Sequence, residues 1–245
     1  MREVPTADGV AEAIVESAPE GGPGVILFMD AFGLRPRIRE IAAEIAGWGY
    51  VVLAPNVFYR DGTVAELAPT GDLTEPEAMG SFFRVAGPRI RHLTADAASG
   101  DFPAYLDALR GLPGVRPGPI GTVGFCMGGR LAVRLSGAFP DAVAACAAVH
   151  TGGLVTEQED SPHLSIADAH AEYLFANADH DRSMTSADVA VLDVALRAAG
   201  RPATNVIVPE AAHGFTMSDT AAWNPGATEW VFGQLRELFY RSLAR

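Results

Sequence analysis

One short motif limits what this chain can fold into more than any other feature. A strand-like run over residues 120–124 ends in Gly124-Phe125-Cys126-Met127-Gly128, and a helix-compatible segment follows at once. The glycines two positions before and after Cys126 suit a sharp, strained turn, because side chains there would collide with neighbouring backbone. Such a turn aims Sγ at the start of the next helix, where free N–H groups and the helix dipole favour a thiolate. The motif therefore predicts a strand, a nucleophile elbow built on Cys126, and a helix.

Strand-like and helix-like segments alternate along the rest of the chain. Residues 25–29 are a continuous apolar run, typical of a strand buried on both faces. Further strands are expected at residues 50–54, 120–124, 144–149, 172–176 and 205–208. Helical spacing or composition is found at residues 38–47, 102–110, 127–139, 187–199 and 227–243. This order predicts an α/β fold with a mostly parallel sheet sandwiched by helices. Since the chain has 245 residues and no linker-like stretch, we expect one domain over residues 1–245.

The pattern weakens over residues 56–101, where prolines, glycines and charges are scattered. We expect short helices there at residues 77–85 and 90–98, lying over the carboxyl edge of the sheet. A stretch of this length within a compact domain is usually functional. Residues 151–170 are expected to form a polar loop.

The charge balance and the lysine content exclude several classes of function. A formal net charge of −12 argues against nucleic acid or an anionic membrane as a partner. All 18 basic residues are arginine, so no lysine is present for a Schiff base or a phosphate-binding loop. No signal-peptide-like segment opens the sequence, and no apolar run approaches about 18 residues, so we expect a cytoplasmic protein. Cys146 lies in a strand-like run and is expected to be a buried, inert thiol.

A thiol nucleophile needs a base, and the base needs an orienting acid. In open α/β sheets, such groups collect on loops beyond the carboxyl ends of the strands. Asp179 follows the predicted strand at 172–176, and His213 follows the one at 205–208. We therefore expect a catalytic triad of Cys126, His213 and Asp179. Asp181, two residues deeper in the same loop, competes for the role of the acid.

Structural roles remain open for each of these residues. The cysteine could pack at a tight strand–helix junction, Asp179 could be an ordinary turn carboxylate, and His213 could be a hydrogen-bonded structural histidine. His150 ends a strand one element after the elbow, so it either lines the pocket or packs in the core. The segment 179–181 offers possible metal ligands, but no His pair at i, i+4 and no Cys-x-x-Cys accompanies it, so we expect no metal.

Taken together, these residues resemble the dienelactone hydrolase family of the α/β-hydrolase superfold, from about Gly24 to the C-terminus. The similarity lies in the elbow at residues 124–129, the acid and base at Asp179 and His213, residues 213–215, 219 and 223–225, and the loop 29–33. The resemblance implies an α/β-hydrolase fold, Cys126 as the nucleophile, and no metal or organic cofactor.

The loop Met29-Asp30-Ala31-Phe32-Gly33 differs from the family in one residue that bears on the mechanism. The best-known members carry a glutamate there that holds or receives the thiol proton. Asp30 is one methylene shorter, so we expect a weaker direct contact with Sγ or a shifted backbone; a strand-end cap is its alternative role. By the same resemblance, the N–H groups of Met127 and of Ala31 or Phe32 form the oxyanion hole.

A second departure concerns the substrate. Family members place an arginine four residues after the catalytic histidine to grip a substrate carboxylate, whereas this chain has Met217 there. This difference argues against dienelactone itself as the substrate. Arg84 in the weakly patterned segment is a candidate replacement, as are three other arginines, Arg60, Arg89 and Arg91.

The sequence thus predicts a hydrolase that cleaves a small carboxylic ester or lactone through an acyl-thioester on Cys126. We expect a monomer or weak homodimer, with no nucleic-acid or membrane partner. Two other classes remain open, a non-catalytic binding domain with the same fold and a peroxide-reactive thiol protein. The second lacks a nearby resolving cysteine.

Overall fold

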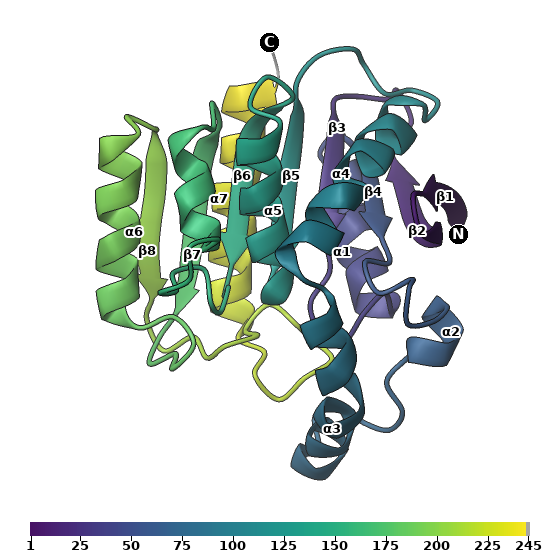
Figure 1. Cartoon of the computed structure of the whole chain (residues 1–245), viewed down its shortest axis with the longest axis vertical. Coiled ribbons are helices and arrows are strands. Elements are labelled where there is room, and N and C mark those ends of the chain that lie inside the picture. The colour runs from purple at the N-terminus through teal and green to yellow at the C-terminus, as the bar shows by residue number, and fades with distance from the viewer. Residues whose placement is uncertain (244–245) are drawn as a thin grey trace.

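A computed structural model describes residues 1–243 and shows an eight-stranded sheet (Figure 1). The strands lie in the order β1-β2-β4-β3-β5-β6-β7-β8. From β4 to β8 neighbouring strands are parallel, whereas β2 is antiparallel to β1 and β4. Their bounds are β1 (Arg2–Thr6), β2 (Gly9–Ser17), β3 (Gly24–Phe28), β4 (Val51–Pro55), β5 (Ile120–Phe125), β6 (Val143–Val149), β7 (Glu172–Ala178) and β8 (Ala203–Val208). The predicted mostly parallel sheet is confirmed.

Helices cover both faces of this sheet. α1 and α7 lie on one face, and α4, α5 and α6 lie on the other (Figure 1). All residues of β3, β4 and β5 are buried, which explains why these strands are continuous apolar runs. The helical bounds are α1 (Pro36–Gly47), α2 (Val64–Leu67), α3 (Pro76–His92), α4 (Ala95–Arg110), α5 (Met127–Ala138), the 3₁₀ helix η1 (Pro162–Ala167), α6 (Ser186–Ala198) and α7 (Pro225–Leu243).

The hydrophobic core includes Cys146, as the sequence predicts. This residue lies on β6 and is fully buried, and burial raises the pKa of its thiol. The raised pKa and the lack of solvent access make the Cys146 thiol unreactive in the folded protein.

Aromatic side chains join the sheet to α4 in the same core. Phe28 of β3 packs against Phe102 and Tyr105 of α4.

The N-terminal hairpin β1–β2 is a part of the sheet that the sequence reading did not predict. Its strands pair antiparallel, with Val4 opposite Ala11 and Thr6 opposite Gly9. Val4, Ala11 and Ala13 are buried while their neighbours are more exposed, so the strands alternate weakly between a core face and a solvent face. This alternation is the signal that a search for continuous apolar runs misses.

The helices after β4 also differ from expectation. The predicted helices at 77–85, 90–98 and 102–110 are in fact two helices, α3 and α4, with Pro88 inside the first and Pro103 inside the second. The break lies at residues 93–94, because the side chain of Thr94 accepts a hydrogen bond from the N–H of Ala97 and caps α4. α3 projects past the carboxyl edge of the sheet, the region where the site is expected (Figure 1).

The expected polar loop after β6 contains one short regular element, η1, within residues 151–170. Across residues 1–243, none of the helices combines the length and the apolar character needed to cross a bilayer.

Candidate active site

Cys126 sits at a sharp turn between β5 and α5, as the motif predicts. Its backbone has φ 53° and ψ −122°, a conformation that non-glycine residues rarely adopt. A Cβ at position 124 would collide with the backbone of Gly128, and a Cβ at position 128 would collide with the carbonyl oxygens of Phe28 and Met29. Gly124 is therefore needed for β5 and the start of α5 to approach each other, and Gly128 is needed for the elbow to approach the end of β3.

Cys126, His213 and Asp181 form a continuous line of contacts. The Nε2 atom of His213 lies 3.1 Å from Sγ of Cys126, and its Nδ1 atom lies 2.6 Å from Oδ2 of Asp181. The other oxygen of Asp181 accepts hydrogen bonds from the backbone N–H (2.8 Å) and the hydroxyl (2.6 Å) of Ser183. Asp181 is thereby fixed from both sides, and its contact sets the orientation of the imidazole.

The expectation that Asp179 orients the histidine is wrong in this geometry. Its carboxylate instead accepts a hydrogen bond of 3.1 Å from the N–H of Glu210. The reason is local: β7 continues to Ala178, two residues beyond the predicted end, and the N–H of Asp179 donates to the carbonyl oxygen of Ala211 in the loop after β8. His180 then adopts a positive φ of 52°, and Asp181 follows this turn in the chain.

The electrostatics of the line favour an ion pair. Burial opposes the shift, but hydrogen bonds to Asp181 and Cys126 raise the pKa of His213 to about 10. Burial also opposes the shift at Asp181, where hydrogen bonds from His213 and Ser183 lower the pKa to about 2. The imidazole is therefore protonated at neutral pH and donates from both ring nitrogens.

The backbone donors expected near the sulfur are not equivalent. The N–H of Phe32 donates to Oδ1 of Asp30 at 3.0 Å, so it is already used within the loop. Within residues 1–243, the N–H of Ala31 has no hydrogen-bond acceptor. Met127 is the first residue of α5, where a backbone N–H has no partner within the helix. Ala31 and Met127 thus remain the candidates for an oxyanion hole.

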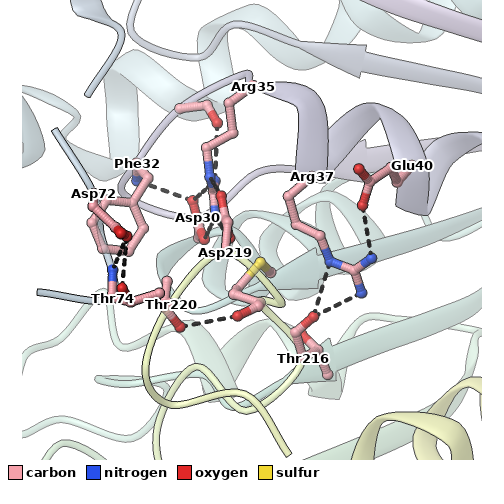
Figure 2. Close-up of polar contacts among 12 residues, drawn as sticks. Asp30, Phe32, Arg35, Arg37, Glu40, Asp72, Thr74, Thr216, Asp219 and Thr220 are labelled. Carbon is pink, nitrogen blue, oxygen red and sulfur yellow. Dashed lines mark hydrogen bonds and ion pairs between the residues drawn. The ribbon is translucent and has the colours of Figure 1, made fainter. Parts of the chain in front are cut away.

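Asp30 does not contact the sulfur, contrary to the expected weak contact. Figure 2 shows Arg35 between Asp30 and Asp219, with its guanidinium bonded to both carboxylates. The two oxygens of Asp30 lie 2.7 and 2.9 Å from Nη1 and Nη2 of Arg35. Arg37 donates to the carbonyl oxygen of Thr216 at 2.8 Å in the same view. Asp30 therefore anchors the loop after β3 to the segment that follows His213.

An apolar cavity of about 150 Å³ lies against the sulfur and the imidazole. As expected, residues from the loops after β3, β6 and β8 line it, joined by two side chains of α3: Asp30, Ala31, Phe32, His150, Met217, Met79 and Phe83. The ring of Phe32 packs 4.9 Å from that of Phe82 and 5.3 Å from that of Phe83. The segment between β4 and α4 thus supplies one wall of the cavity, in agreement with its expected place over the sheet edge.

His150 is fully buried at the base of this cavity. Its Nε2 atom lies 2.8 Å from the hydroxyl of Thr216, and its ring lies 5.6 Å from that of His213. Burial, together with the charge of His213, holds the pKa of His150 well below its usual value. His150 is therefore a neutral residue that lines the cavity and also packs against the ring of His213.

The arginines proposed from the sequence do not reach the cavity lining. Arg84 is exposed and donates to the hydroxyl of Ser81, so its expected place in the pocket is wrong. Arg60 is paired with Asp8 and Asp101. Arg89 is buried, and its Nη2 atom lies 3.4 Å from the carbonyl oxygen of Ala31.

The arginine that does lie near the nucleophile is Arg130, which sequence reasoning missed. It stands four residues after Cys126 on α5, and this helical spacing is the signal that could have found it.

Comparisons with known proteins identify the family of this chain. The model of the dienelactone hydrolase family matches residues 11–243. A Synechocystis protein named "Putative carboxymethylenebutenolidase" is 28% identical over 225 residues, covering 90% of this chain and 87% of that protein. The carboxymethylenebutenolidase of Pseudomonas sp. is 23% identical over 222 residues, covering 90% of this chain and 85% of that enzyme.

A solved structure gives the same picture of the fold. The crystal structure of a "Putative Dienelactone Hydrolase" from Klebsiella pneumoniae has a TM-score of 0.81 to this chain at 22% identity, covering 98% of this chain and 96% of that one. The mostly parallel sheet and the cysteine elbow are those that the resemblance implied. Because the family model spans almost all of the described residues, this chain, with its α/β-hydrolase fold, belongs to the dienelactone hydrolase family.

Proposed function

We propose that this chain hydrolyses small carboxylic esters or lactones through Cys126, His213 and Asp181, with an acyl-thioester intermediate. Its family makes it a hydrolase, and its relatives include the carboxymethylenebutenolidase of Pseudomonas sp.. The observation that carries the proposal is the line of contacts from Sγ through the imidazole to Asp181, beside an apolar cavity. A cavity of about 150 Å³ suits a small acyl group.

Acylation begins at the contact between Cys126 and His213. The raised pKa of His213 supports an imidazolium whose Nε2 lies 3.1 Å from Sγ, and the sulfur reacts as a thiolate. The thiolate attacks the substrate carbonyl carbon, and the carbonyl electron pair moves onto oxygen. The N–H groups of Met127 and Ala31 stabilise this oxyanion, an effect of about 3–4 kcal/mol per donor in other hydrolases. The intermediate then collapses, and His213 gives its proton to the departing ester oxygen.

Deacylation reverses these roles with water. The now neutral His213 removes a proton from water, and the hydroxide attacks the thioester carbon. Collapse of the second tetrahedral intermediate releases the carboxylic acid and restores the thiolate beside the imidazolium. A thiolate leaves more readily than a serine alkoxide, so the site suits activated substrates such as enol lactones better than amides.

Substitution of the two cysteines tests the proposal. Cys126→Ala is expected to lower kcat/KM for 4-nitrophenyl acetate by at least about a thousandfold, because the nucleophile is lost. Cys146→Ala is the matched control, since that thiol is buried in β6 and touches none of the cavity. It should change turnover little.

The outcome that contradicts the proposal is equal activity of the two variants, whether both are inactive or both retain wild-type turnover. Circular dichroism of each variant separates loss of catalysis from loss of fold.

A further inference from the structure

The apolar cavity beside Cys126 is large enough for one aromatic ring. Its volume is about 150 Å³, and the sulfur of Cys126 and the imidazole of His213 are both part of its lining. An apolar cavity of about 150 Å³ in an engineered protein core binds benzene. A ring bound here therefore lies directly beside the reacting atoms.

Two phenylalanines and two methionines form the walls that such a ring would touch. Phe32 comes from the loop after β3, and Met217 comes from the loop after β8. Met79 and Phe83 lie one turn apart on α3. Aromatic rings pack edge-to-face or offset against one another, and a thioether sulfur packs well against the edge of a ring. These walls therefore favour an aromatic ring over a saturated group of similar size.

The aromatic part of this wall is held in place by its neighbours. The guanidinium of Arg35 lies over the ring of Phe32, 5.1 Å from its centre. The ring of Phe32 also packs against those of Phe82 and Phe83, and these two rings lie 5.5 Å from each other. Phe82 is buried, but Phe83 is 42% exposed although it lines the cavity. A bound ring would thus meet a wall that is already formed and would cover part of the exposed Phe83.

The charges around the cavity disfavour a substrate carboxylate. Among the lining residues, which all lie within residues 1–243, the ionised partners of other side chains are Asp30 and His213, and none is an arginine. Both oxygens of Asp30 are bonded to Arg35, and Nδ1 of His213 is bonded to Asp181. A carboxylate in the cavity would lie near the charge of Asp30 without a free counter-ion, which is costly in an apolar site.

We infer that the apolar cavity binds an uncharged aromatic ring of the ester or lactone, and that Phe32 and Phe83 select it. The inference rests on the proposed function and names its substrate class: an aryl group next to the reacting carbonyl, on the acyl or the alcohol side. Phe83 is the position to test, because its substitution leaves the contacts of Asp30 with Arg35 in place.

Protection of the thiol tests the inference without ester hydrolysis. Benzamide should slow the alkylation of Cys126 by iodoacetamide, because it covers Sγ. Its half-protecting concentration should be at least about twofold lower than those of cyclohexanecarboxamide, which is saturated, and 4-carboxybenzamide, which is anionic. No protection by benzamide, or equal protection by all three amides, would overturn the inference.

A pair of variants assigns this preference to the aromatic wall. Phe83→Leu keeps an apolar side chain but removes the ring, so the advantage of benzamide over cyclohexanecarboxamide should fall at least about twofold. Val85→Ala is the matched control, since Val85 is an exposed residue of the same helix outside the cavity lining. It should leave the advantage at its wild-type value. An equal fall in both variants, or in neither, would contradict the role of Phe83.

Three esters then show which side of the substrate carries the ring. Trifluoroethyl benzoate has a ring on the acyl side, phenyl acetate has one on the alcohol side, and trifluoroethyl acetate has none. Dividing kcat/KM of Phe83→Leu by the wild-type value cancels differences in intrinsic reactivity. This quotient should be at least about twofold lower for the ester whose ring the cavity holds than for trifluoroethyl acetate.

The esters and the amides together separate the two proposals. Equal quotients for all three esters would reject the aromatic subsite while leaving the hydrolase proposal intact. A wild-type protein that hydrolyses none of the esters but is protected selectively by benzamide would reject the proposed function alone.

Discussion

At the scale of residues, the site depends on which carboxylate meets His213. Asp181 makes that contact at 2.6 Å, and Ser183 holds its other oxygen. Asp179, two residues earlier, is turned toward the N–H of Glu210. The two aspartates lie in one loop, yet only Asp181 is hydrogen-bonded to the imidazole.

Substitution at these two positions should therefore give unequal effects. Asp181→Asn removes the charge that helps to hold the pKa of His213 high and leaves the imidazole poorly oriented. We expect kcat/KM for 4-nitrophenyl acetate to fall by about a hundredfold or more. Asp179→Asn keeps an acceptor for the N–H of Glu210 and should alter kcat/KM little. A larger loss in Asp179→Asn than in Asp181→Asn would show that the acid has been assigned wrongly.

The sequence predicted Cys126 and His213 because each lies near a short local pattern: glycines around the cysteine, and a strand that ends five residues before the histidine. The correct aspartate could not be chosen in this way. That choice depends on where β7 ends and on the positive φ of His180, and neither is visible in residue types alone. The pairing of Arg35 with both Asp30 and Asp219 was likewise out of reach, because Arg35 and Asp219 lie 184 residues apart in the chain.

At the scale of elements, buried parallel strands were the most predictable part of the fold. Their continuous apolar runs follow from burial on both faces, as in β3 and β4. The hairpin β1–β2 was missed because its strands alternate only weakly. The boundary between α3 and α4 was misplaced because the break lies at the Thr94 cap, inside the expected helix at 90–98. The loops at the carboxyl edge of the sheet meet at the site through contacts between segments far apart in the chain, such as those of His213 with Cys126 and Asp181.

At the scale of the whole molecule, the ion pair between His213 and Asp181 links folding stability to pH. The pKa of His213 is raised in the folded state, so its stabilising effect is fully present below the unfolded value of 6.5 and is lost as pH rises toward about 10. The pKa of Asp181 is lowered, so its contribution is present above 3.8 and is lost as pH falls toward about 2.

Comparison with His213→Gln isolates the histidine's part of this dependence. The free energy of unfolding, measured in urea at several pH values, should favour the wild-type protein most near pH 6. The advantage should shrink steadily as pH approaches 10. A difference that grows with rising pH would contradict the assigned protonation state of the imidazole.

The central claim is that the acyl group passes through the sulfur of Cys126. Its most direct test is peptide mass mapping of the wild-type protein, quenched in acid during turnover of 4-nitrophenyl acetate. The account predicts one acetyl group on the peptide that contains Cys126 and none on the peptide that contains Cys146. Turnover without a label on Cys126 under conditions that preserve thioesters, or a label confined to another residue, would contradict it.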